Sequence, residues 1–402
     1  MEKQPIALVI PWYGDDIRGG AEKECNYLAH SLTTAGQPVE VFTTCVKDAA
    51  CDRGKNTIQP GVYTESGITV RRFPVREQRD LDCYAASNLR IYHNDGFTEE
   101  DEEIYFREDI NSEKMYAFIR GHKDGYRAFM FIPYMYGVTY NGSACCPEKS
   151  ILIPCLHDES YAYMRVLKQK MNSFRGMVFL AKPEKDLAMK LYGLEDVKTA
   201  VLGGGLDTAW SETCDGALFR EKYRISQDFI LFAGRKDAGK KADELIRFFL
   251  RYKQDRRDAG LKLVLIGGGD LPVAIPAGYR SDVIDLGFVS VEDKHNAFAA
   301  CTLLCNPSYF ESFSLVIMES WLAKRPVLVS AHCAVTTNFA KETNGGLWYQ
   351  NYGEFRGCLD FLLHNRRSGD AMGGNGYQYV MGHFTHEKIA KNYLAFIESC
   401  GL

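Results

Sequence analysis

Two glutamates, Glu311 and Glu319, stand eight residues apart in the stretch NPSYFESFSLVIMESWLAK, which otherwise has the apolar character of a protein core. We predict that a strand ends before this stretch, that the chain then turns, and that a helix begins at Ser312. Glu311 would precede the helix N-terminus, and Glu319 would lie two turns along on roughly the same face. The unpaired N–H groups of a helix N-terminus attract anions, phosphate especially. We expect these donors to be the amides of Ser312, Phe313, Ser314 and Leu315.

Two cations follow another predicted strand. In FILFAGRKDAGKKADELI the apolar run 229–235 ends in Arg235, and Lys240 comes five residues later. In a doubly wound fold a diphosphate lies at the carboxyl end of a strand. Arginine can bind phosphate through two parallel hydrogen bonds, whereas lysine acts as a point charge. This stretch therefore predicts a diphosphate site.

Two further stretches place glycine or histidine after a strand. Gly19 and Gly20 end the loop in PWYGDDIRGGAEKE and open the first predicted helix, so the backbone there can approach a bulky or charged ligand. The loop matches neither GxGxxG nor a Walker loop. His157 ends the predicted strand 150–157 and precedes two acidic residues, which makes it a candidate for chemistry.

Each of these stretches also has a plain structural interpretation. Glu311 can be a helix-capping carboxylate and Glu319 a hydrogen-bonded surface acid, because acidic residues are common at helix starts. Arg235 and Lys240 can belong to an exposed basic loop, and the two glycines to a flexible loop. His157 can be structural, as most lone histidines are. The residues alone leave both interpretations open.

Apolar runs that alternate with helical patterns must position these side chains. Runs with little polar alternation are typical of parallel strands that are covered on both faces. We predict strands over 6–12, 39–44, 68–73, 128–134, 150–157, 176–181, 229–235, 262–269, 283–289, 302–308 and 326–331. Two consecutive strand–helix series indicate an α/β protein with two doubly wound domains, whose ligands bind in the cleft between them.

The glycines of VLGGGLDT (201–208) separate the two series. We therefore predict an N-terminal domain over 1–206, a C-terminal domain over 207–385, and a final helix within 386–402 that can pack back on the N-terminal domain. The acidic stretch 95–115 interrupts the first series. We expect a solvated insertion or helical face there, with a part in shaping a binding site as the alternative.

Composition excludes several classes of protein. The 48 Lys and Arg residues and the 52 Asp and Glu residues give a formal net charge of −4, which argues against a protein built mainly to bind nucleic acid. The 13 cysteines form no CxxC pair and no Cys/His cluster with zinc spacing, so we expect no metal site and reduced thiols in the cytoplasm. The start of the chain lacks signal-peptide features, and no apolar run approaches the roughly 20 residues of a membrane span.

The stretch NPSYFESFSLVIMES resembles the E-x7-E motif of retaining GT-B glycosyltransferases. FAGRKDAGK, LVLIGGGD, LGFV and the GGAE loop are similar to other segments of glycosyltransferase family 4, in the family's order. The resemblance covers nearly the whole chain, most closely 228–331, and SILIPCLHDE is similar to a subgroup found in bacterial surface-polysaccharide gene sets. It implies a GT-B fold, in which two doubly wound Rossmann-like domains face a central cleft. The N-terminal domain would bind the acceptor and the C-terminal domain the nucleotide sugar.

On the donor side, the resemblance implies that Arg235 and Lys240 take part in catalysis by neutralising the donor diphosphate. It implies that Glu319 holds the ribose hydroxyls. Gly268 and Val289, in the segments LVLIGGGD and LGFV, are expected to contact the donor together with the first-turn amides named above.

At the reacting sugar, the resemblance implies that Glu311 lies beside the transferred group and His157 near its reactive face. Gly19 and Gly20 match the loop that closes over phosphate or acceptor. Lys241 stands where the family often has glycine, and the acids after His157 are not universal in the family. These departures leave the identity of the donor sugar open.

The resemblance implies a retaining hexosyltransferase that moves a sugar from a UDP- or GDP-sugar to a hydroxyl of a glycan or lipid-linked glycan, in polysaccharide or glycoconjugate biosynthesis. It implies no cofactor, no metal and a cytoplasmic location, with peripheral association at the inner membrane face left open. The alternatives are a GT-B-fold sugar-nucleotide epimerase, a phosphorylase, for which no pyridoxal-phosphate lysine motif is visible, and a catalytically inactive nucleotide-sugar-binding homologue. A Rossmann dehydrogenase would need a glycine fingerprint that the chain lacks.

Overall fold

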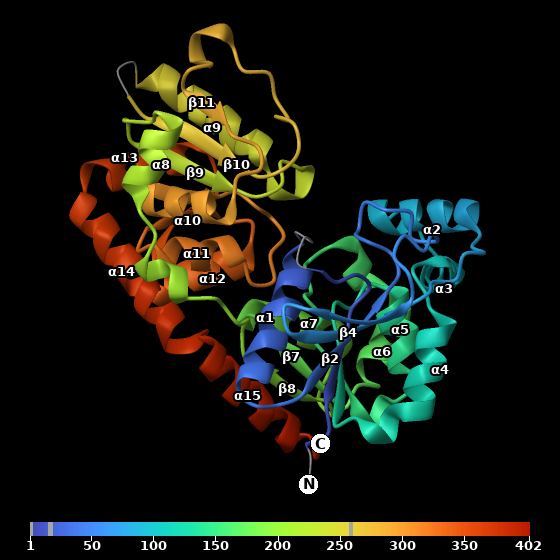
Figure 1. The fold of residues 1–402 in the computed structure, drawn as a ribbon. Coiled ribbons are helices and arrows are strands. Elements are labelled where there is room, and N and C mark those ends of the chain that lie inside the picture. The colour runs from blue at the N-terminus through green and yellow to red at the C-terminus, as the bar shows by residue number, and fades with distance from the viewer. Residues whose placement is uncertain (1–2, 15–18, 257–259) are drawn as a thin grey trace. The chain divides into compact units, whose positions relative to one another are not determined.

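The computed structural model describes residues 3–14, 19–256 and 260–402. The chain forms two compact units (Figure 1). Unit 1 consists of Met1–Leu206 and Phe384–Leu402, and unit 2 consists of Asp207–His383. Each unit has its own parallel sheet with helices around it.

The end of the chain returns to unit 1. The sequence analysis assigned Phe384 and Thr385 to the second domain, but the Leu206 amide donates to the Phe384 carbonyl (3.0 Å) and Leu206 pairs with Thr385. These contacts lead into the last helix, α15 (His386–Ser399), which packs against α1 (Gly20–Thr34).

The sheet of unit 1 has the strand order β3-β4-β2-β1-β5-β6-β7-β8. Its strands are β1 (Ile6–Val9), β2 (Val39–Thr44), β3 (Gly61–Glu65), β4 (Ile68–Phe73), β5 (Ala128–Phe131), β6 (Ser150–Leu152), β7 (Gly176–Phe179) and β8 (Lys198–Val201). All neighbouring strands run parallel except β3, which runs antiparallel to β4. The sequence analysis missed β3 and β8, because both lie at sheet edges, carry polar residues and are largely exposed.

Helices cover both faces of this sheet. Besides α1 and α15 they are α2 (Leu81–His93), α3 (Glu99–Glu108), α4 (Glu113–His122), α5 (Gly137–Ser143), α6 (Arg165–Met171) and α7 (Lys182–Tyr192). The acidic stretch 95–115 contains α3, so the expectation of a helical face is confirmed there, but this helix also has a buried side. Tyr105 and Phe106 are buried, and the buried Glu102 carboxylate accepts a hydrogen bond from the Val166 amide (2.9 Å).

The sheet of unit 2 has the order β11-β10-β9-β12-β13-β14, all parallel. Its strands are β9 (Phe229–Ala233), β10 (Lys262–Ile266), β11 (Val283–Asp285), β12 (Leu303–Asn306), β13 (Val327–Ser330) and β14 (Gly346–Tyr349). Its helices are α8 (Gly216–Tyr223), α9 (Ala242–Asp255), α10 (Val291–Ala300), α11 (Leu315–Leu322), α12 (Ala334–Thr343), α13 (Tyr352–His364) and α14 (Arg366–His383).

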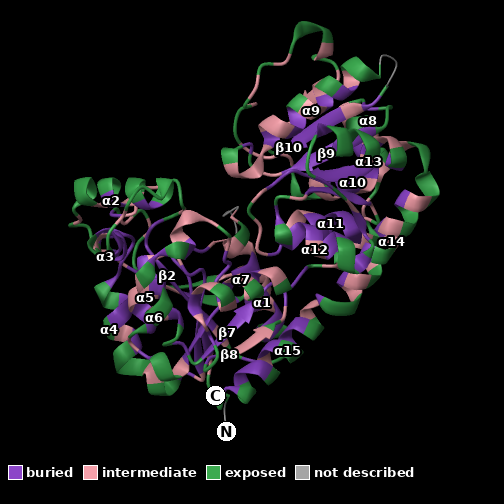
Figure 2. Cartoon of the chain, turned by 180° about the vertical axis from the view of Figure 1, so that it is seen from behind, coloured by how far each residue is buried: buried purple, intermediate pink, exposed green. Residues whose placement is uncertain are grey.

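The strands form the buried centre of each unit (Figure 2). Helix α9 shows how the sequence covers them, because Leu245, Ile246, Phe249 and Tyr252 recur at helical spacing and are all buried. Most predicted strands extended past the real strand ends, since apolar side chains such as Ile10 and Trp12 remain buried in the loops that follow. Among the described residues, no helix is both long and apolar enough to cross a membrane.

Candidate functional site

The strand order of unit 2 reverses between β9 and β12. From β9 the chain first moves outward to β10 and β11, and then returns to the other side of β9 with β12. Ligands of doubly wound sheets bind at such a switch point, outside the carboxyl ends of the strands. The loops 234–241 and 307–314 follow these two strand ends. They contact each other, because the Tyr309 amide donates to the Gly239 carbonyl (3.4 Å).

The structure brings Lys240 and Glu311 together at this place. Lys240 Nζ donates to Glu311 Oε1 at 2.8 Å, and Asn306 Nδ2 lies 3.4 Å from the same oxygen. The side chains of Lys240 and Glu311 are 30% and 11% exposed. The pair is thus partly withdrawn from water, and it remains open enough to exchange partners with a ligand.

Helix α11 begins later than the sequence suggested. It starts at Leu315, and Ser314, in the left-handed region with φ 69°, is its N-cap. Ser312 and Phe313 lie in the preceding loop, so Glu311 and Glu319 do not share a helical face. Of the four amides predicted to lie at the start of the helix, those of Ser314 and Leu315 do so, and those of Ser312 and Phe313 do not.

The N-terminus of α11 is left without a capping side chain among the described residues. The Ser314 hydroxyl instead accepts a hydrogen bond from Asn306 Nδ2 (2.8 Å), and Glu311 is paired with Lys240. The interpretation of Glu311 as a helix cap is therefore wrong. An uncapped helix start at the end of a strand remains available to an anion.

Arg235 lies on the surface of the same loop. Its side chain is 71% exposed, and its Nε forms an ion pair with Asp237 Oδ2 (3.3 Å). Asp237 also accepts from the Lys240 amide (3.0 Å), which shapes the short 3₁₀ turn Ala238–Lys240. Exposed ion pairs contribute at most about 1 kcal/mol, so Arg235 can leave Asp237 for a ligand at small cost.

The sequence analysis missed Lys236, which is fully buried. Its Nζ donates to the Gly267 carbonyl (2.6 Å) and forms an ion pair with Asp285 Oδ1 (3.1 Å). These bonds tie together the ends of β9, β10 and β11. A lysine between Arg235 and Asp237 gives no sequence signal of burial, because lysine is ordinarily a surface residue.

Gly268 and Val289 follow the ends of β10 and β11. A Cβ on Gly268 would overlap the ring of Phe288, which is 60% exposed and would have to shift. Val289 is half-buried. The Gly268 carbonyl accepts a hydrogen bond from the Lys236 amide (2.8 Å). Gly268 and Val289 both follow strands on the β10 and β11 side of the switch point, where the resemblance placed the donor.

Glu319 is the most withdrawn of the predicted acids. It lies on α11, is 5% exposed, and one of its oxygens forms an ion pair with Lys294 Nζ of α10. Its other oxygen, Oε2, is buried and accepts no hydrogen bond from the described residues. The interpretation of Glu319 as a surface acid is therefore wrong. A buried carboxylate oxygen without a donor is costly, and a ligand hydroxyl would satisfy it.

The remaining predicted site residues belong to unit 1. His157 lies five residues beyond the end of β6, so the predicted strand 150–157 was too long. Cys155 has φ 52°, which is incompatible with a continuing strand. His157 Nδ1 lies 3.4 Å from Glu159 Oε1, which also accepts from the Tyr134 hydroxyl (3.2 Å).

Beneath this loop, Glu184 accepts hydrogen bonds from the Leu156 amide (2.7 Å) and the Leu180 amide (2.6 Å). Burial raises the pKa of Glu184 to about 7, and its backbone donors and His157 only partly offset this effect. Glu24 of α1 is also buried, and burial and the neighbouring Glu184 raise its pKa as well. These two carboxyl groups lie in the interior of unit 1.

Gly19 is the N-cap of α1, and Gly20 is its first residue. A Cβ on Gly19 would overlap the Glu22 carboxylate, which accepts from Trp12 Nε1, whereas Gly20 faces open space. The other residues of this loop, 15–18, lie outside the described residues. The space beside Gly19 is thus occupied by the end of the Glu22 side chain.

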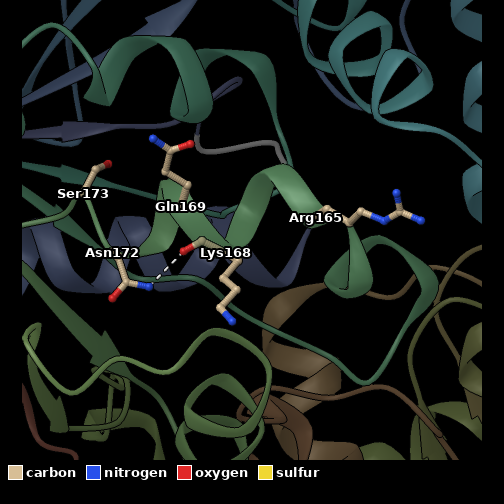
Figure 3. Close-up of a pocket in the computed structure, with 5 residues that line it drawn as sticks. All are labelled: Arg165, Lys168, Gln169, Asn172 and Ser173. Atoms are coloured by element: carbon tan, nitrogen blue, oxygen red, sulfur yellow. Dashed lines mark hydrogen bonds between the residues drawn. The ribbon is translucent and has the colours of Figure 1, made fainter.

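The described residues contain no group of three His, Cys, Asp or Glu side chains that could hold a metal ion. A shallow depression over α6 in unit 1 contains none of the predicted site residues (Figure 3). It is lined by Arg165, Lys168, Gln169, Asn172 and Ser173.

Known proteins resemble this chain in two ways. Residues 227–365, which span the switch-point loops, match the family described as "Glycosyl transferases group 1". A Methanocaldococcus jannaschii protein named an uncharacterized glycosyltransferase is 26% identical over 231 residues, 54% of this chain and 57% of that one. A D-inositol 3-phosphate glycosyltransferase of Streptomyces avermitilis is 31% identical over 163 residues, 37% and 35% of the two chains. The chain thus matches little more than half, or less, of the length of these relatives.

Among solved structures, Anabaena HepE in complex with UDP and glucose has a TM-score of 0.69 at 14% identity, covering 98% of this chain and 100% of that one. This likeness, together with the two doubly wound sheets, establishes the architecture. The chain has the GT-B fold, and its second unit carries the region that matches the group 1 glycosyl transferases.

Proposed function

We propose that this protein transfers a sugar from a nucleoside diphosphate sugar to an acceptor hydroxyl. The observation that carries this proposal is the Lys240–Glu311 pair beside the uncapped start of α11, at the switch point of unit 2. The family match over 227–365 contains this arrangement, and the HepE complex with UDP and glucose supports a nucleotide sugar as donor.

In the proposed donor complex, the diphosphate lies between Lys240, Arg235 and the first amides of α11. Lys240 Nζ has three donors and uses one on Glu311, so it can bind phosphate while it still holds the acid. Arg235 would leave Asp237 and take the phosphate bidentately. These prearranged positive groups then stabilise the negative charge that develops on the departing diphosphate, and removing one of them should lower kcat by about 10²–10³.

Glu311 and Glu319 have different roles in this proposal. Glu311 accepts hydrogen bonds from hydroxyls of the transferred sugar, oriented by Lys240 and Asn306. Glu319 uses its unpartnered Oε2 to hold the ribose hydroxyls, while Lys294 keeps its other oxygen in place. Hydrogen bonds to an ionised carboxylate are about twice as strong as neutral ones.

The finer assignments are also proposals. We propose a retaining hexosyl transfer without a metal, in which the leaving phosphate takes the proton of the acceptor hydroxyl and His157 lies near the reactive face of the sugar. The donor would be a UDP- or GDP-sugar, and the product a polysaccharide or glycoconjugate. The intact set of Lys240, Glu311 and Glu319 speaks against an inactive binding homologue.

Calorimetry with UDP, GDP and ADP tests the donor site. One of them should bind the wild type, and Arg235→Ala should weaken this binding about tenfold, because a charge-assisted bidentate contact is lost. Arg247→Ala is the matched control, since Arg247 is also an exposed arginine in an ion pair of unit 2, with Asp243. If no nucleoside diphosphate binds, or if both variants bind as the wild type does, the proposed site is wrong.

Turnover then separates transfer from its rivals. The wild type should release the nucleoside diphosphate from its nucleotide sugar only when an acceptor is present, apart from slow hydrolysis. A sugar-nucleotide epimerase would form free epimer without an acceptor. Glu311→Ala should abolish transfer in a protein that still unfolds cooperatively.

A further inference from the structure

The sheet of unit 1 has its own switch point, between β1 and β5. The chain order reverses there, because β1 pairs with β2 on one side and with β5 on the other. Trp12 follows β1 and Tyr136 follows β5, and their rings meet edge to face with centroids 5.0 Å apart. This is the position in unit 1 that corresponds to the donor site of unit 2.

Arg53, from the loop after β2, lies over both rings. Its guanidinium carbon is 5.8 Å from the Trp12 ring centroid and 5.3 Å from the Tyr136 ring centroid. Its Nη1 donates to Asp109 Oδ1 (2.7 Å) and to the Tyr84 hydroxyl (3.0 Å). Among the described residues, Nε and Nη2 of Arg53 donate to nothing, and the side chain is 27% exposed.

Arg79, from the segment after β4, joins the same cluster. Its side chain lies against Gly54, and its guanidinium carbon is 5.1 Å from the Tyr84 ring centroid. Its Nε donates to the Glu108 carbonyl, while neither of its Nη atoms bonds to any part of the chain that the structure describes. Burial and the nearby Arg53 lower the pKa of Arg79, although Asp109 and Tyr84 oppose this effect.

The buried carboxylate beside these arginines, Asp109, is bonded to Arg53 and not to Arg79. Asp109 is buried, and besides Arg53 it accepts hydrogen bonds from the Tyr84 hydroxyl (3.3 Å) and the Gly137 amide (2.9 Å). The exposed Asp52 is paired with Lys55 (3.6 Å). Two half-buried guanidinium groups therefore have one buried carboxylate between them, with unused donors on both.

Two acids also lie near the aromatic pair. The Glu22 carboxylate accepts from Trp12 Nε1, and Glu159 lies beside His157. Both acids act on the pKa of Tyr136, which burial raises, and Arg53 acts on it in the opposite direction. Asp109, beside Arg53, raises this pKa as well, so Tyr136 has charged groups of both signs near it.

We propose that this edge of unit 1 binds an acceptor that carries an anionic group, phosphate or carboxylate, beside a hydroxylated sugar ring. Arg53 and Arg79 take the anion with their unused N–H groups, in the fork geometry that suits both kinds of anion. The sugar ring lies beside the half-buried Tyr136, whereas Trp12, which is 1% exposed, supports the Tyr136 ring and does not contact the ligand. This inference rests on the proposed function and adds the chemical class of the acceptor.

Calorimetry with glucose 6-phosphate, glucuronate and glucose, in the presence of the nucleoside diphosphate that the wild type binds, tests the inference. At least one of the two anionic sugars should bind about tenfold more tightly than glucose. The two anionic probes distinguish phosphate from carboxylate. Arg79→Gln should remove this preference and fold normally, since Arg79 has no carboxylate partner among the described residues.

Two further variants complete the design. Arg53→Lys keeps a cation beside the buried Asp109 but loses the fork, and should also weaken anion binding. Arg165→Gln changes an exposed arginine of unit 1 over the depression in Figure 3, and should have no effect. Nucleoside diphosphate binding should be equal in all of these proteins.

The outcomes separate this inference from the proposed function. If the nucleoside diphosphate binds but neither anionic sugar is preferred over glucose, or if Arg79→Gln keeps the preference, the acceptor class is wrong and the donor site stands. If Arg79→Gln weakens nucleoside diphosphate binding, the arginines belong to the donor and the acceptor assignment falls. If no nucleoside diphosphate binds the wild type, the proposed function fails, whatever the sugars do.

Discussion

Replacing Lys240 by methionine would test the central ion pair most directly. The change removes the ammonium group and keeps most of the side-chain volume. Glu311, whose side chain is 11% exposed, would keep only the 3.4 Å contact to Asn306. Because the pair is neither fully exposed nor fully buried, we expect a loss of about 1–2 kcal/mol in the free energy of unfolding. The protein should therefore remain folded.

The catalytic effect should be larger than this loss. If Lys240 stabilises the departing diphosphate, kcat/KM should fall by about 10²–10³, which is about 3–4 kcal/mol of transition-state stabilisation. Glu311→Gln and the double variant with Lys240→Met complete a double-mutant cycle. The stability effects of the two single variants should be strongly non-additive, because each removes the same contact.

Transfer kinetics and urea unfolding would be measured on the same preparations. Lys262→Met is a matched control, because Lys262 forms a 2.7 Å pair with Asp282 but lies at the first residue of β10, at the amino end of the strand. It should lose stability and keep activity. The reasoning is refuted if Lys240→Met loses stability while its kcat/KM stays within tenfold of the wild type.

Three further predictions address the supporting residues. The pKa of Glu184 is about 7 in the folded protein and 4.5 in the unfolded chain, so its contribution to the free energy of unfolding should be most favourable below pH 4.5 and fall by about 3 kcal/mol as the pH rises to 7. In urea unfolding at pH 5 and 8, Glu184→Gln should show a smaller decline in stability than the wild type. An equal decline in both proteins would contradict this expectation. Lys236→Met should lower the free energy of unfolding by about 1–3 kcal/mol, because it leaves Asp285 and the Gly267 carbonyl without their donor. An unchanged melting temperature would show that Lys236 does not hold the strand ends together. Glu319→Gln should weaken binding of the nucleoside diphosphate about tenfold and of its 2′,3′-dideoxy analogue much less, whereas equal losses in calorimetry would remove Glu319 from the ribose.

The central strands could be predicted from the sequence because their residues are apolar on both faces. The strands β1 and β9 consist entirely of buried apolar residues, and the predicted runs 6–12 and 229–235 contain them. The edge strands β3 and β8 could not be predicted, since an edge strand with a solvated face carries the same polar residues as a loop. The strand ends were overestimated wherever the following loop stays buried.

The site could be predicted only as a set of residue types. Chain order places Lys240 and Glu311 after two strands, but only the pairing of β9 with β12 makes those strands neighbours. Helix α11 begins three residues later than predicted, because Ser314 is in a left-handed conformation and its hydroxyl is bonded to Asn306. Helix propensity does not include such a contact between side chains eight residues apart. Lys236 was missed because a sequence does not show which lysines are buried, and Lys294, which is 21% exposed, because a sequence does not show which carboxylate a lysine will face.

The four cations of the site differ in burial, and this difference separates their roles. Each is paired with a carboxylate in the structure: Arg235 with Asp237, Lys236 with Asp285, Lys240 with Glu311 and Lys294 with Glu319.

Lys236 is fully buried, so moving it would leave a charge unpaired in the interior; it is suited to hold the loops in place. Arg235 loses little when it changes partner, because its pair is in solvent. Lys240 lies between these limits and can hold Glu311 while it binds a phosphate. In the proposed donor complex, the ligand would displace only the exposed Arg235–Asp237 pair, while the pairs formed by Lys236 and Lys294 would hold the geometry for this exchange.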